Sequence, residues 1–395
     1  MNELLQKMLA GFLSRFGGSR NGIRCFMAPG RVNLIGEHTD YNGGYVMPAA
    51  LDLGSFLLAR PRTDRIVRLA DSQWPYLLEA DLNHLPDYFQ EPWGNYQLAI
   101  AHVLQQQGYL LQGCDFYYQE TVPLASGLSS SAAIELVTAE AFNQLNQLQI
   151  SSVRLAQLAQ TAECDCIGVQ CGIMDQFTAA MGKANHALLL RCSNLQYQTI
   201  PLELGDCRLL IVNTNQPRSL IESKYNQRRR ECEAALALLQ KVLPQAANLA
   251  EITPEQFAAA GSVLEDELLF RRARHVITEN ARVLTAAKVL AAGDLTAFGL
   301  LLNASHLSLR DDYEVTGAEL DCLAETAQKI PGVLGARMTG AGFGGCTINL
   351  LQFNQIEAFK TAITAEYQQK IGRSPSFYQP GIGDGAREIH DLVLR

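Results

Sequence analysis

The chain has 395 residues, 48% of them hydrophobic, so it can bury a large core and is long enough for two domains. The formal net charge of -8, from 32 basic and 40 acidic side chains, excludes a general attraction to nucleic acid. No apolar run of about 18 residues could span a bilayer, and the first residues lack a secretory pattern. We expect a cytoplasmic protein with no membrane or nucleic-acid partner. We expect a monomer and leave an oligomer open.

The first half of the chain begins as strands and continues as helices. The apolar spacing of residues 2–16 predicts a packing helix that ends at Gly17-Gly18. Extended segments rich in Val, Ile, Phe and Leu follow at about 23–27, 31–35, 54–60 and 65–70. A helix at about 94–107, a strand at 114–120 and helices at about 130–147 and 152–164 come next.

The second half carries strands at 187–191 and 207–212, and helices then dominate to about residue 330. The last part reads as a strand at 333–338, a Gly-rich turn, a strand at 346–351, a helix at 354–371 and a strand at 376–379. Strands and helices alternate without a regular βαβ period, which predicts an α+β class. We place a boundary near residue 200 and expect domains at 1–200 and 201–395.

The ten cysteines are scattered along the chain. The tightest group is Cys164, Cys166 and Cys171, but it lacks C-x-x-C spacing and nearby histidines. Because cysteine is among the most buried residue types, we expect reduced, mostly buried thiols and no zinc site.

A serine-rich segment, Pro123–Ala133 (P-L-A-S-G-L-S-S-S-A-A), lies between a predicted strand and a predicted helix. Serine at a helix start caps free backbone N–H groups, so an ordinary helix cap is one interpretation. The same N–H groups and the helix dipole also form a phosphate site, and Gly127 lets the backbone approach it closely. No G-x-x-x-x-G-K-S/T motif supports a P-loop protein. The segment alone leaves both interpretations open.

A second polar segment, Ala28–Gly44, holds one Arg, one Glu, one His and one Asp among turn-forming residues. The carboxylates of Glu37 and Asp40 and the imidazole of His38 suit the hydroxyls of a polyol. The planar fork of Arg31 suits a phosphoryl group. Taken singly, each is more often a solvated loop side chain.

A third segment, Met338–Cys346, formally contains G-x-G-x-x-G at Gly340, Gly342 and Gly345. A dinucleotide-binding turn must open a helix, whereas the residues that follow here read as a strand. We therefore expect a turn that packs closely against a ligand or another part of the backbone.

Together the three segments resemble the motifs of the family of galactokinases, homoserine kinases, mevalonate kinases and phosphomevalonate kinases. Arg31–Asn42 (R-V-N-L-I-G-E-H-T-D-Y-N) resembles the galactokinase signature, of which other members keep only the opening. The resemblance runs from about residue 12 to the C-terminus and includes Cys171–Gln176, Ser223–Asn226 and Ser305–Glu314. It implies an ATP-dependent kinase that phosphorylates the anomeric hydroxyl of galactose, giving galactose 1-phosphate and ADP.

The resemblance also implies the architecture and the cofactors. It implies an N-terminal lobe with a ribosomal-protein-S5-like mixed sheet and helices, and a C-terminal lobe with a ferredoxin-like α/β sandwich. The active site would lie in the cleft between the lobes, with ATP and Mg2+ as cofactors.

By position, the resemblance assigns roles to individual residues. Arg31 and Asp175 would flank the reacting oxygen. The sugar would contact Glu37, His38, Thr39, Asp40, Gly172, Asp175 and Tyr225. The nucleotide would be held by Ala125, Ser126, Gly127, Leu128, Ser129, Ser130 and Ser131, with Ser72 and Trp93 lining its pocket. Mg2+ would be held by Ser131 and Glu163.

The expected mechanism follows from the loose transition state of phosphoryl transfer, which mostly needs positioning and charge neutralisation. Arg31 and Mg2+ would supply both. Aspartate is a weak base towards a sugar hydroxyl, so Asp175 is first an orienting group that accepts the proton late. Without the motif, Glu163 would be read as a solvated helix residue and Tyr225 as a core residue.

Two other functions stay open. One is a kinase of a related sugar, such as N-acetylgalactosamine or arabinose, because small pocket changes alter selection. The other is a galactose and ATP sensor that regulates transcription through a protein partner. Such sensors resemble galactokinases with a shortened phosphate loop, whereas Ser131 and Ala132 are present here and favour catalysis.

Overall fold

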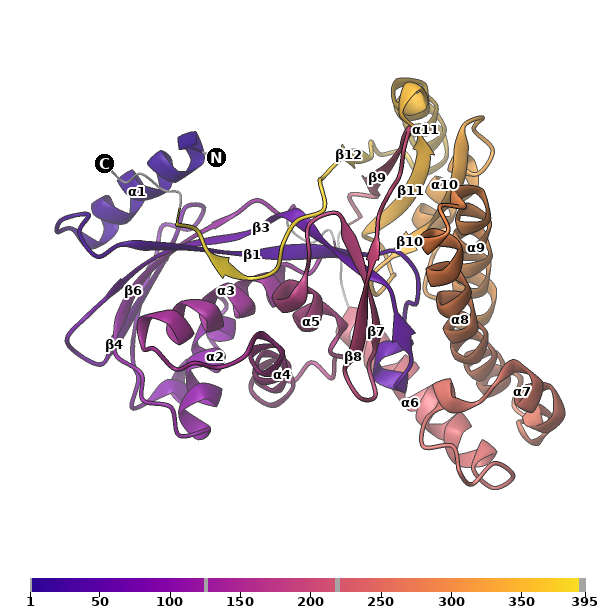
Figure 1. Ribbon diagram of the computed structural model, residues 1–395, viewed down its shortest axis with the longest axis horizontal. Coiled ribbons are helices and arrows are strands. Elements are labelled where there is room, and N and C mark those ends of the chain that lie inside the picture. The colour runs from indigo at the N-terminus through magenta and orange to yellow at the C-terminus, as the bar shows by residue number, and fades with distance from the viewer. Residues whose placement is uncertain (1, 124–126, 217–220, 391–395) are drawn as a thin grey trace.

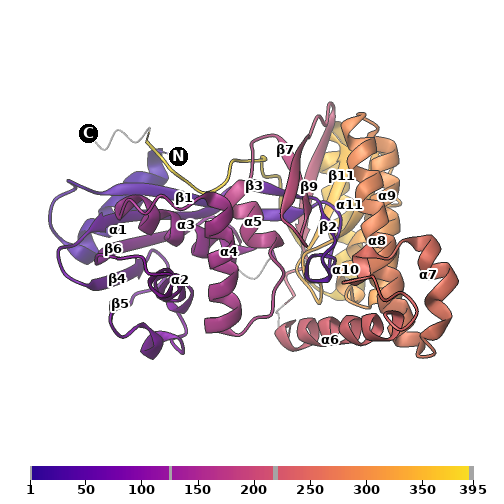
Figure 2. The same ribbon diagram turned by 60° about the horizontal axis from the view of Figure 1, so that its bottom comes forward.

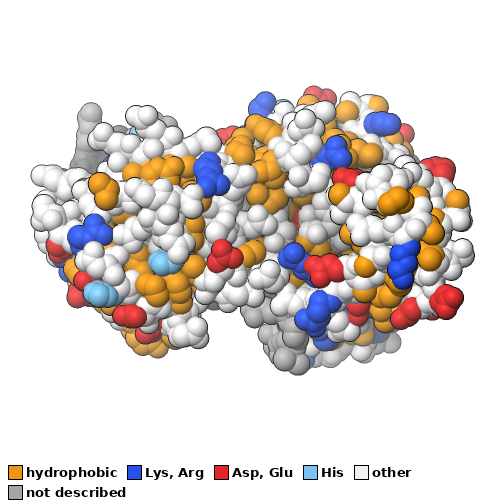
Figure 3. Space-filling view, turned by 90° about the horizontal axis from the view of Figure 1, so that it is seen from below, with side chains coloured by type: hydrophobic (Ala, Val, Ile, Leu, Met, Phe, Trp, Pro, Cys, Tyr) orange, Lys and Arg blue, Asp and Glu red, His pale blue; other side chains and the backbone are white. Residues whose placement is uncertain are grey.

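The structure is a computed structural model that describes residues 2–123, 127–216 and 221–390. Figure 1 shows an elongated molecule, with a large sheet and its helices at one end and long helices with a second sheet at the other. The space-filling view in Figure 3 shows two rounded lobes joined at a narrower waist. The predicted α+β class with two lobes is therefore confirmed. The boundary near residue 200 stays a prediction.

A six-stranded mixed sheet is the centre of the N-terminal lobe, with the strand order β13-β1-β3-β6-β4-β5. The strands are β1 (Arg24–Asn33), β3 (Pro48–Pro61), β4 (Ile66–Asp71), β5 (Leu77–Asp81), β6 (Cys114–Glu120) and β13 (Arg387–Glu388). β4 and β6 run parallel, and the other neighbouring pairs are antiparallel. β13 comes from the far end of the chain and pairs with β1 at the edge of this sheet.

β1 is one strand where the sequence predicted two, at 23–27 and 31–35. The Pro29-Gly30 pair lies inside the strand. The register of β1 with β3 shifts between Pro29 and Arg31, which marks a β-bulge at this pair. Such a bulge accommodates a proline that a regular ladder would reject. Glycine is required next to it, since a Cβ on Gly30 would lie 2.5 Å from the carbonyl oxygen of Leu128. The bulge therefore brings Arg31 beside the serine-rich segment.

Alternate residues of the central strands point to opposite faces of this sheet, as a strand period of two requires. Phe26 and Leu57 lie in the core beneath four helices, whereas Met27 and Phe56 pack against α1 (Asn2–Phe16). The four helices are α2 (Asn95–Gln106), α3 (Ser130–Leu145), α4 (Ser152–Ala162) and α5 (Met174–Met181). The predicted helix at 2–16 is confirmed, as are those near 94–107, 130–147 and 152–164.

A small three-stranded sheet, β2-β7-β8, consists of β2 (Tyr45–Val46), β7 (His186–Arg191) and β8 (Gln196–Pro201). The sequence predicted β7 but not β8. The first four residues of β8 are exposed and mostly polar, so no apolar alternation marks it as a strand. The pairing with β7 defines it instead.

An antiparallel four-stranded sheet forms the centre of the C-terminal lobe, in the order β10 (Val333–Thr339), β11 (Cys346–Gln352), β9 (Cys207–Asn213) and β12 (Ser376–Tyr378). Leu210 and Val212 face α10 (Ala318–Ala327) and α11 (Ile356–Ile371). Leu209 and Ile211 face α8 (Glu267–Ala291) and α9 (Leu295–Ser308). Figure 2 shows α8 and α9 side by side, with α6 (Ile221–Leu239) crossing below and α7 (Pro254–Ala260) at the outer end. The predicted elements of this lobe are confirmed to within two residues.

One hydrophobic cluster spans both lobes. It contains Val32 of β1, Ile348 of β11 and Phe298 of α9, together with residues of β3, β7, β8, β9 and α8. Burial of apolar surface is the main favourable term in folding, so this shared core fixes the lobes relative to one another. The loops that leave β1 and β10 consequently have defined positions.

Most of the thiols are enclosed, as predicted. The ten cysteines are all free, six of them are buried, and the half-buried ones are Cys164, Cys166, Cys171 and Cys192. Among the described helices, none is long and apolar enough to cross a membrane.

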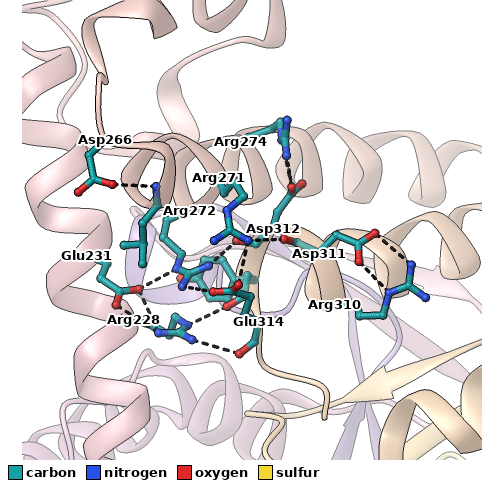
Figure 4. A network of polar contacts seen from close by, with 12 residues as sticks. Arg228, Glu231, Asp266, Arg271, Arg272, Arg274, Arg310, Asp311, Asp312 and Glu314 are labelled. Atoms are coloured by element: carbon teal, nitrogen blue, oxygen red, sulfur yellow. Dashed lines mark hydrogen bonds and ion pairs between the residues drawn. The ribbon is translucent and has the colours of Figure 1, made fainter. Parts of the chain in front are cut away.

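An ion-pair network fixes α6 to α8 and to the π-helical turn Leu309–Tyr313, as Figure 4 shows. Its centre is Arg272 on α8, whose side chain is 1% exposed. Arg272 donates to the carboxylate of Glu231 at 2.7 Å, to that of Glu314 at 2.7 Å and to the carbonyl oxygen of Asp312 at 2.6 Å. The network therefore sets the position of α6.

Replacing Arg272 with methionine should destabilise the protein by about 3 kcal/mol, because it removes three hydrogen bonds made by a buried guanidinium, one of them to the backbone carbonyl of Asp312. Urea unfolding measures this free energy. The control is Arg271→Met, since Arg271 pairs with Glu314 in a more exposed position and should cost less than about 1 kcal/mol. Equal losses in the two variants would contradict the central role of Arg272.

Candidate active site

Arg31 joins three segments that are distant in the sequence. Its Nε and Nη2 donate to the two carboxylate oxygens of Asp175, each at 2.9 Å, in the bidentate geometry that suits a guanidinium. Its Nη1 donates to the carbonyl oxygen of Gly127 at 2.7 Å. The Arg31 side chain is 5% exposed, whereas that of Asp175 is 29% exposed. The carboxylate of Asp175 is thus the part of the pair that faces outward.

Ser129 precedes α3 but does not cap it. It adopts a left-handed conformation, φ 60°, and its side chain makes no capping hydrogen bond. The hydroxyl donates instead to the second carboxylate oxygen of Asp175. The interpretation of this serine as an ordinary helix cap is therefore wrong. The N–H groups of the first helical turn have no intrahelical partner and carry the positive end of the dipole, which suits an anion.

The predicted phosphate-contacting residues are only partly described. Gly127, Leu128, Ser129, Ser130 and Ser131 are described, whereas Ala125 and Ser126 lie outside the described residues. Ser130 and Ser131 are half-buried in the first turn of α3, and Leu128 is buried. Their contact with phosphate stays a prediction.

The Gly-rich turn between β10 and β11 packs directly against the serine-rich segment. Gly340 has φ 85°, and a Cβ there would lie 3.0 Å from the carbonyl oxygen of Gly127. Gly342 has φ 80°, and a Cβ would lie 2.2 Å from the carbonyl oxygen of Val315. The turn is followed by strand β11 and not by a helix, as predicted. Its glycines are required by close approach of backbone to backbone.

Glu37 lies beneath this turn. Its side chain is 1% exposed, its carboxylate is paired with the guanidinium of Arg337, and it accepts from the Gly340 N–H at 3.0 Å. Arg337 also donates to the carbonyl oxygens of Asn33 and Leu34, at 3.2 and 2.9 Å. Arg337 is not among the residues predicted from the sequence, although an arginine inside the apolar strand before the Gly-rich turn is a signal for it. The predicted contact of Glu37 with sugar stays a prediction.

His38 is engaged by protein groups at both ring nitrogens. Burial lowers the pKa of His38 to about 3, so the ring is neutral. Nε2 lies 3.2 Å from the carbonyl oxygen of Ala341 and donates to it, which leaves Nδ1 to accept from the Tyr41 hydroxyl at 2.9 Å. The Tyr41 oxygen then accepts from the hydroxyl of Tyr313 at 2.7 Å. The role of His38 in sugar binding likewise stays a prediction.

Tyr225 of α6 lies beside the signature loop, whereas Thr39 lies within it. The half-buried ring of Tyr225 lies 5.6 Å from the His38 ring and 5.1 Å from the Tyr41 ring, measured between centroids. Thr39 is fully buried, and its hydroxyl lies 2.8 Å from the carbonyl oxygen of Gly36. Tyr225 is therefore partly exposed beside the signature loop, whereas Thr39 is enclosed within that loop.

Asp40, Gly172 and Asp175 come together beside the Arg31 pair. A Cβ on Gly172 would lie 2.0 Å from a carboxylate oxygen of Asp40, so only glycine fits there. Burial, and after it the charge of Asp175, raises the pKa of Asp40 to about 7, while Arg31 opposes the shift. Two carboxylates, from the signature and from α5, thus share one partly enclosed space.

A second pair of acids lies behind Asp175. The amide nitrogen of Gln176 donates to Glu163 and to Glu135, the latter at 3.2 Å. Burial raises the pKa of Glu163 to about 7, and the charge of Asp175 adds to this shift. Burial also raises the pKa of Glu135, to which the charge of Glu163 contributes. Glu135 and Gln176 are not among the site residues predicted from the sequence, although Gln176 ends the segment Cys171–Gln176 that carries part of the resemblance.

The predicted Mg2+ ligands fit that ion chemically. Ser131 lies one helical turn before Glu135 and on the same face of α3, so it faces the side on which Glu163 lies. A hydroxyl and a carboxylate are hard oxygen donors, which Mg2+ prefers. Within the described residues, no three His, Cys, Asp or Glu side chains are placed to hold a metal ion by themselves. Mg2+ usually takes one or two protein ligands and completes its shell with phosphate and water.

Ser72 and Trp93 contact other parts of the N-terminal lobe. Ser72 is exposed after β4, and its N–H donates to the carbonyl oxygen of Tyr118 at 3.1 Å. Trp93 is half-buried before α2 and packs against the core beneath the helices. Their place in a nucleotide pocket stays a prediction.

The raised pKa of Asp40 predicts a pH dependence of stability. Between the ordinary pKa near 4 and the folded value of about 7, the folded protein keeps a proton that the unfolded chain releases. The free energy of unfolding should therefore fall as pH rises through this window, and Asp40→Asn should reduce the fall. Urea unfolding at pH 5 and pH 8 tests this. Exposed Asp87→Asn serves as the control, and identical slopes in the parent and Asp40→Asn would refute the prediction.

Three family models match the chain. The galactokinase galactose-binding signature matches residues 10–61, which include the segment from Arg31 to Asp40. The N-terminal domain of GHMP kinases matches residues 95–183, and their C-terminal domain matches residues 286–369. The residues assembled above come from all three regions.

Similar proteins cover nearly the whole chain. The galactokinase of Halalkalibacterium halodurans is 47% identical over 97% of this chain and 97% of its own, and that of Enterococcus faecalis is 46% identical over 98% and 100%. The crystal structure of Lactococcus lactis galactokinase complexed with galactose has a TM-score of 0.95 and 45% identity, covering 98% of this chain and 100% of that one. The mevalonate kinase of Methanococcus jannaschii, 19% identical with a TM-score of 0.64, shares the fold. The chain belongs to the galactokinase family.

Proposed function

We propose that this protein transfers the γ-phosphoryl group of ATP to the anomeric hydroxyl of galactose, giving galactose 1-phosphate and ADP. The observation that carries the proposal is the bidentate Arg31–Asp175 pair, held against the serine-rich segment and beside the signature residue Asp40. Similarity to galactokinases over nearly the full length supports the same activity. An arginine next to an outward-facing carboxylate suits a reaction that joins a phosphoryl group to a hydroxyl.

Asp175 orients the sugar hydroxyl in this proposal. A carboxylate has about four lone-pair positions, and here Arg31 takes two and Ser129 takes one. One position remains for the hydroxyl that attacks. Holding that hydroxyl in line with the phosphoryl group is worth more to a loose transition state than early removal of its proton. Asp175 accepts the proton late.

Arg31 stabilises the transferring group. Its fork is already held by Asp175 and Gly127, so it needs little reorganisation when negative charge passes from the leaving oxygen. The phosphates lie at the start of α3, where the N–H groups from Ser130 onward and the helix dipole favour anions. The nearby Gly340 turn closes this part of the site.

The sugar lies over Asp40, Gly172 and Tyr225 in this proposal. Their side chains or backbone border the same space as the outward carboxylate of Asp175. Glu37, His38 and Thr39 act by shaping the loop that presents Asp40, because their polar groups are already engaged inside the protein.

In this proposal Glu163 and Ser131 would hold Mg2+, which when bound would neutralise charge on the phosphates. Gln176 keeps the Glu163 carboxylate in place through the hydrogen bond from its amide nitrogen. The same amide nitrogen donates to Glu135, so the two carboxylates lie close together and repel one another. A cation near both would weaken this repulsion.

A substrate panel tests the function. Purified protein with ATP and Mg2+ is assayed against galactose, N-acetylgalactosamine, arabinose, glucose and mevalonate, and the product is identified by NMR. We expect the highest kcat/KM with galactose, phosphate on the anomeric oxygen, and loss of activity with EDTA that Mg2+ restores. A higher kcat/KM with another compound would overturn the galactose assignment. Binding of ATP and galactose without transfer would indicate a sensor.

Asp175→Asn tests the proposed role of the carboxylate. We expect kcat to fall by about 100-fold or more, since the group that orients the attacking hydroxyl and accepts its proton late is replaced, while galactose binding changes little. Calorimetry measures sugar binding, and a thermal melt verifies folding. Asp165→Asn, an exposed substitution in the nearby π-helical turn Glu163–Ile167, should resemble the parent. A kcat of Asp175→Asn within about tenfold of the parent would exclude an essential proton acceptor.

A further inference from the structure

Two thiols face one another behind the proposed Mg2+ ligand. The sulfur atoms of Cys164 and Cys171 are 4.0 Å apart, and both side chains are half-buried, so small molecules can reach them. A third cysteine nearby, Cys166, is also half-buried but packs against the core beneath the helices. The proposed reaction assigns no role to the sulfur at position 164.

The chain between the two thiols is folded back on itself. The π-helical turn Glu163–Ile167 ends at Gly168, which has φ 89°. The N–H groups of Gly168 and Val169 both donate to the carbonyl oxygen of Glu163, at 3.0 and 3.2 Å. The side chain of Gln160 then donates to the carbonyl oxygen of Cys171 at 3.1 Å. These bonds hold the returning segment so that Cys171 faces Cys164.

We propose that Cys164 and Cys171 are an oxidation site, at which a peroxide forms a reversible disulfide that lowers the activity of the neighbouring phosphoryl-transfer site. The loss of activity rests on the proposed function, whereas the disulfide does not. The sulfurs must approach from 4.0 Å to about 2.0 Å, a change within reach of side-chain rotation and a small shift of the 168–172 loop.

The chemistry balances with hydrogen peroxide as the oxidant. The Cys164 sulfur attacks one peroxide oxygen, the O–O bond breaks, and water leaves after taking up the thiol proton, which gives a sulfenic acid. The Cys171 sulfur then attacks the sulfenic sulfur, an S–S bond forms, the S–O bond breaks, and a second water leaves. Two electrons pass from the thiols to the peroxide. A dithiol such as dithiothreitol reverses the change by thiol–disulfide exchange.

The disulfide would remove a hydrogen bond from Glu163. In the reduced protein the Cys171 thiol donates to a carboxylate oxygen of Glu163 at 3.4 Å. A disulfide sulfur has no proton, so this donor disappears whatever else moves. Hydrogen-bond partners of metal ligands commonly alter affinity or activity by about 10- to 100-fold. The effect would therefore fall on the group proposed to hold Mg2+.

The Cys164–Cys171 disulfide would also affect the residues proposed to bind the sugar. Gly172 follows Cys171 directly, and its Cα lies so close to the Asp40 carboxylate that no side chain fits between them. Movement of Cys171 towards Cys164 displaces this contact. We therefore expect oxidation to lower kcat through Glu163 and to raise the KM for galactose through Asp40.

The experiment treats the reduced full-length protein with hydrogen peroxide and follows thiols and activity separately. Trypsin leaves the three nearby cysteines on one peptide, residues 155–183, so differential alkylation and fragment spectra must locate the link. We expect Cys164 and Cys171 to lose reactivity together while Cys166 stays alkylated. Activity should fall by about tenfold or more and return with dithiothreitol.

Two matched variants decide the assignment. Cys164→Ser should keep the activity of the reduced parent and resist peroxide, whereas Cys166→Ser should be inactivated and rescued like the parent. Inactivation of Cys164→Ser to the same extent as the parent would overturn the proposal. A link that includes Cys166, or a complete 164–171 disulfide with unchanged activity, would overturn it as well. If the reduced parent phosphorylates no sugar, the proposed function fails, while the peptide analysis still reports on the disulfide.

Discussion

The guanidinium of Arg31 is the contact on which the rest of the site depends. It follows the bulge in β1 and donates to Gly127 before α3 and to Asp175 in α5, so one side chain fixes three segments. Its planar fork satisfies two carboxylate oxygens and one carbonyl oxygen at once, which a lysine ammonium on a flexible stem would not reproduce. Because the carboxylate of Asp175 is held from one side, it faces outward in a single orientation.

A second buried pair extends this arrangement across the lobes. Arg337 of the C-terminal lobe binds Glu37 of the signature and two carbonyl oxygens nearby, while Glu37 also accepts from the Gly340 N–H. A buried ion pair is costly to desolvate unless its remaining hydrogen-bonding groups are satisfied, and here most of them are. The main effect of the pair is therefore to fix the position of the Gly-rich turn against the serine-rich segment, and its contribution to the free energy of unfolding is secondary.

The site brings several buried carboxylates together, an arrangement that lowers the stability of the fold because their charges are desolvated and repel one another. Asp40, Glu135 and Glu163 all have raised pKa values, caused first by burial and then by neighbouring carboxylates. Such groups cluster where function requires them, because a cation or a hydroxyl-rich ligand supplies the missing partner. The paired thiols lie at the edge of this cluster, where a change in one donor reaches the carboxylates directly.

Local patterns in the sequence determined most elements: the Val-, Ile-, Phe- and Leu-rich segments that form β3 and β4, and the helical spacing of residues 2–16. They also excluded a dinucleotide turn at Gly340, because a strand follows it. The resemblance supplied the family and pointed to Arg31 and Asp175. Only the tertiary structure decided that Pro29 lies in a bulge, that β8 is a strand, and that Ser129 bonds Asp175 instead of capping α3. It also decided that Glu37 and His38 are engaged inward, by Arg337 and Tyr41. The reason is physical: hydrophobic periodicity reports burial along one segment, but it does not show which group a polar side chain meets in the folded chain. That partner lies 3 residues away for His38 and Tyr41 and 300 residues away for Glu37 and Arg337.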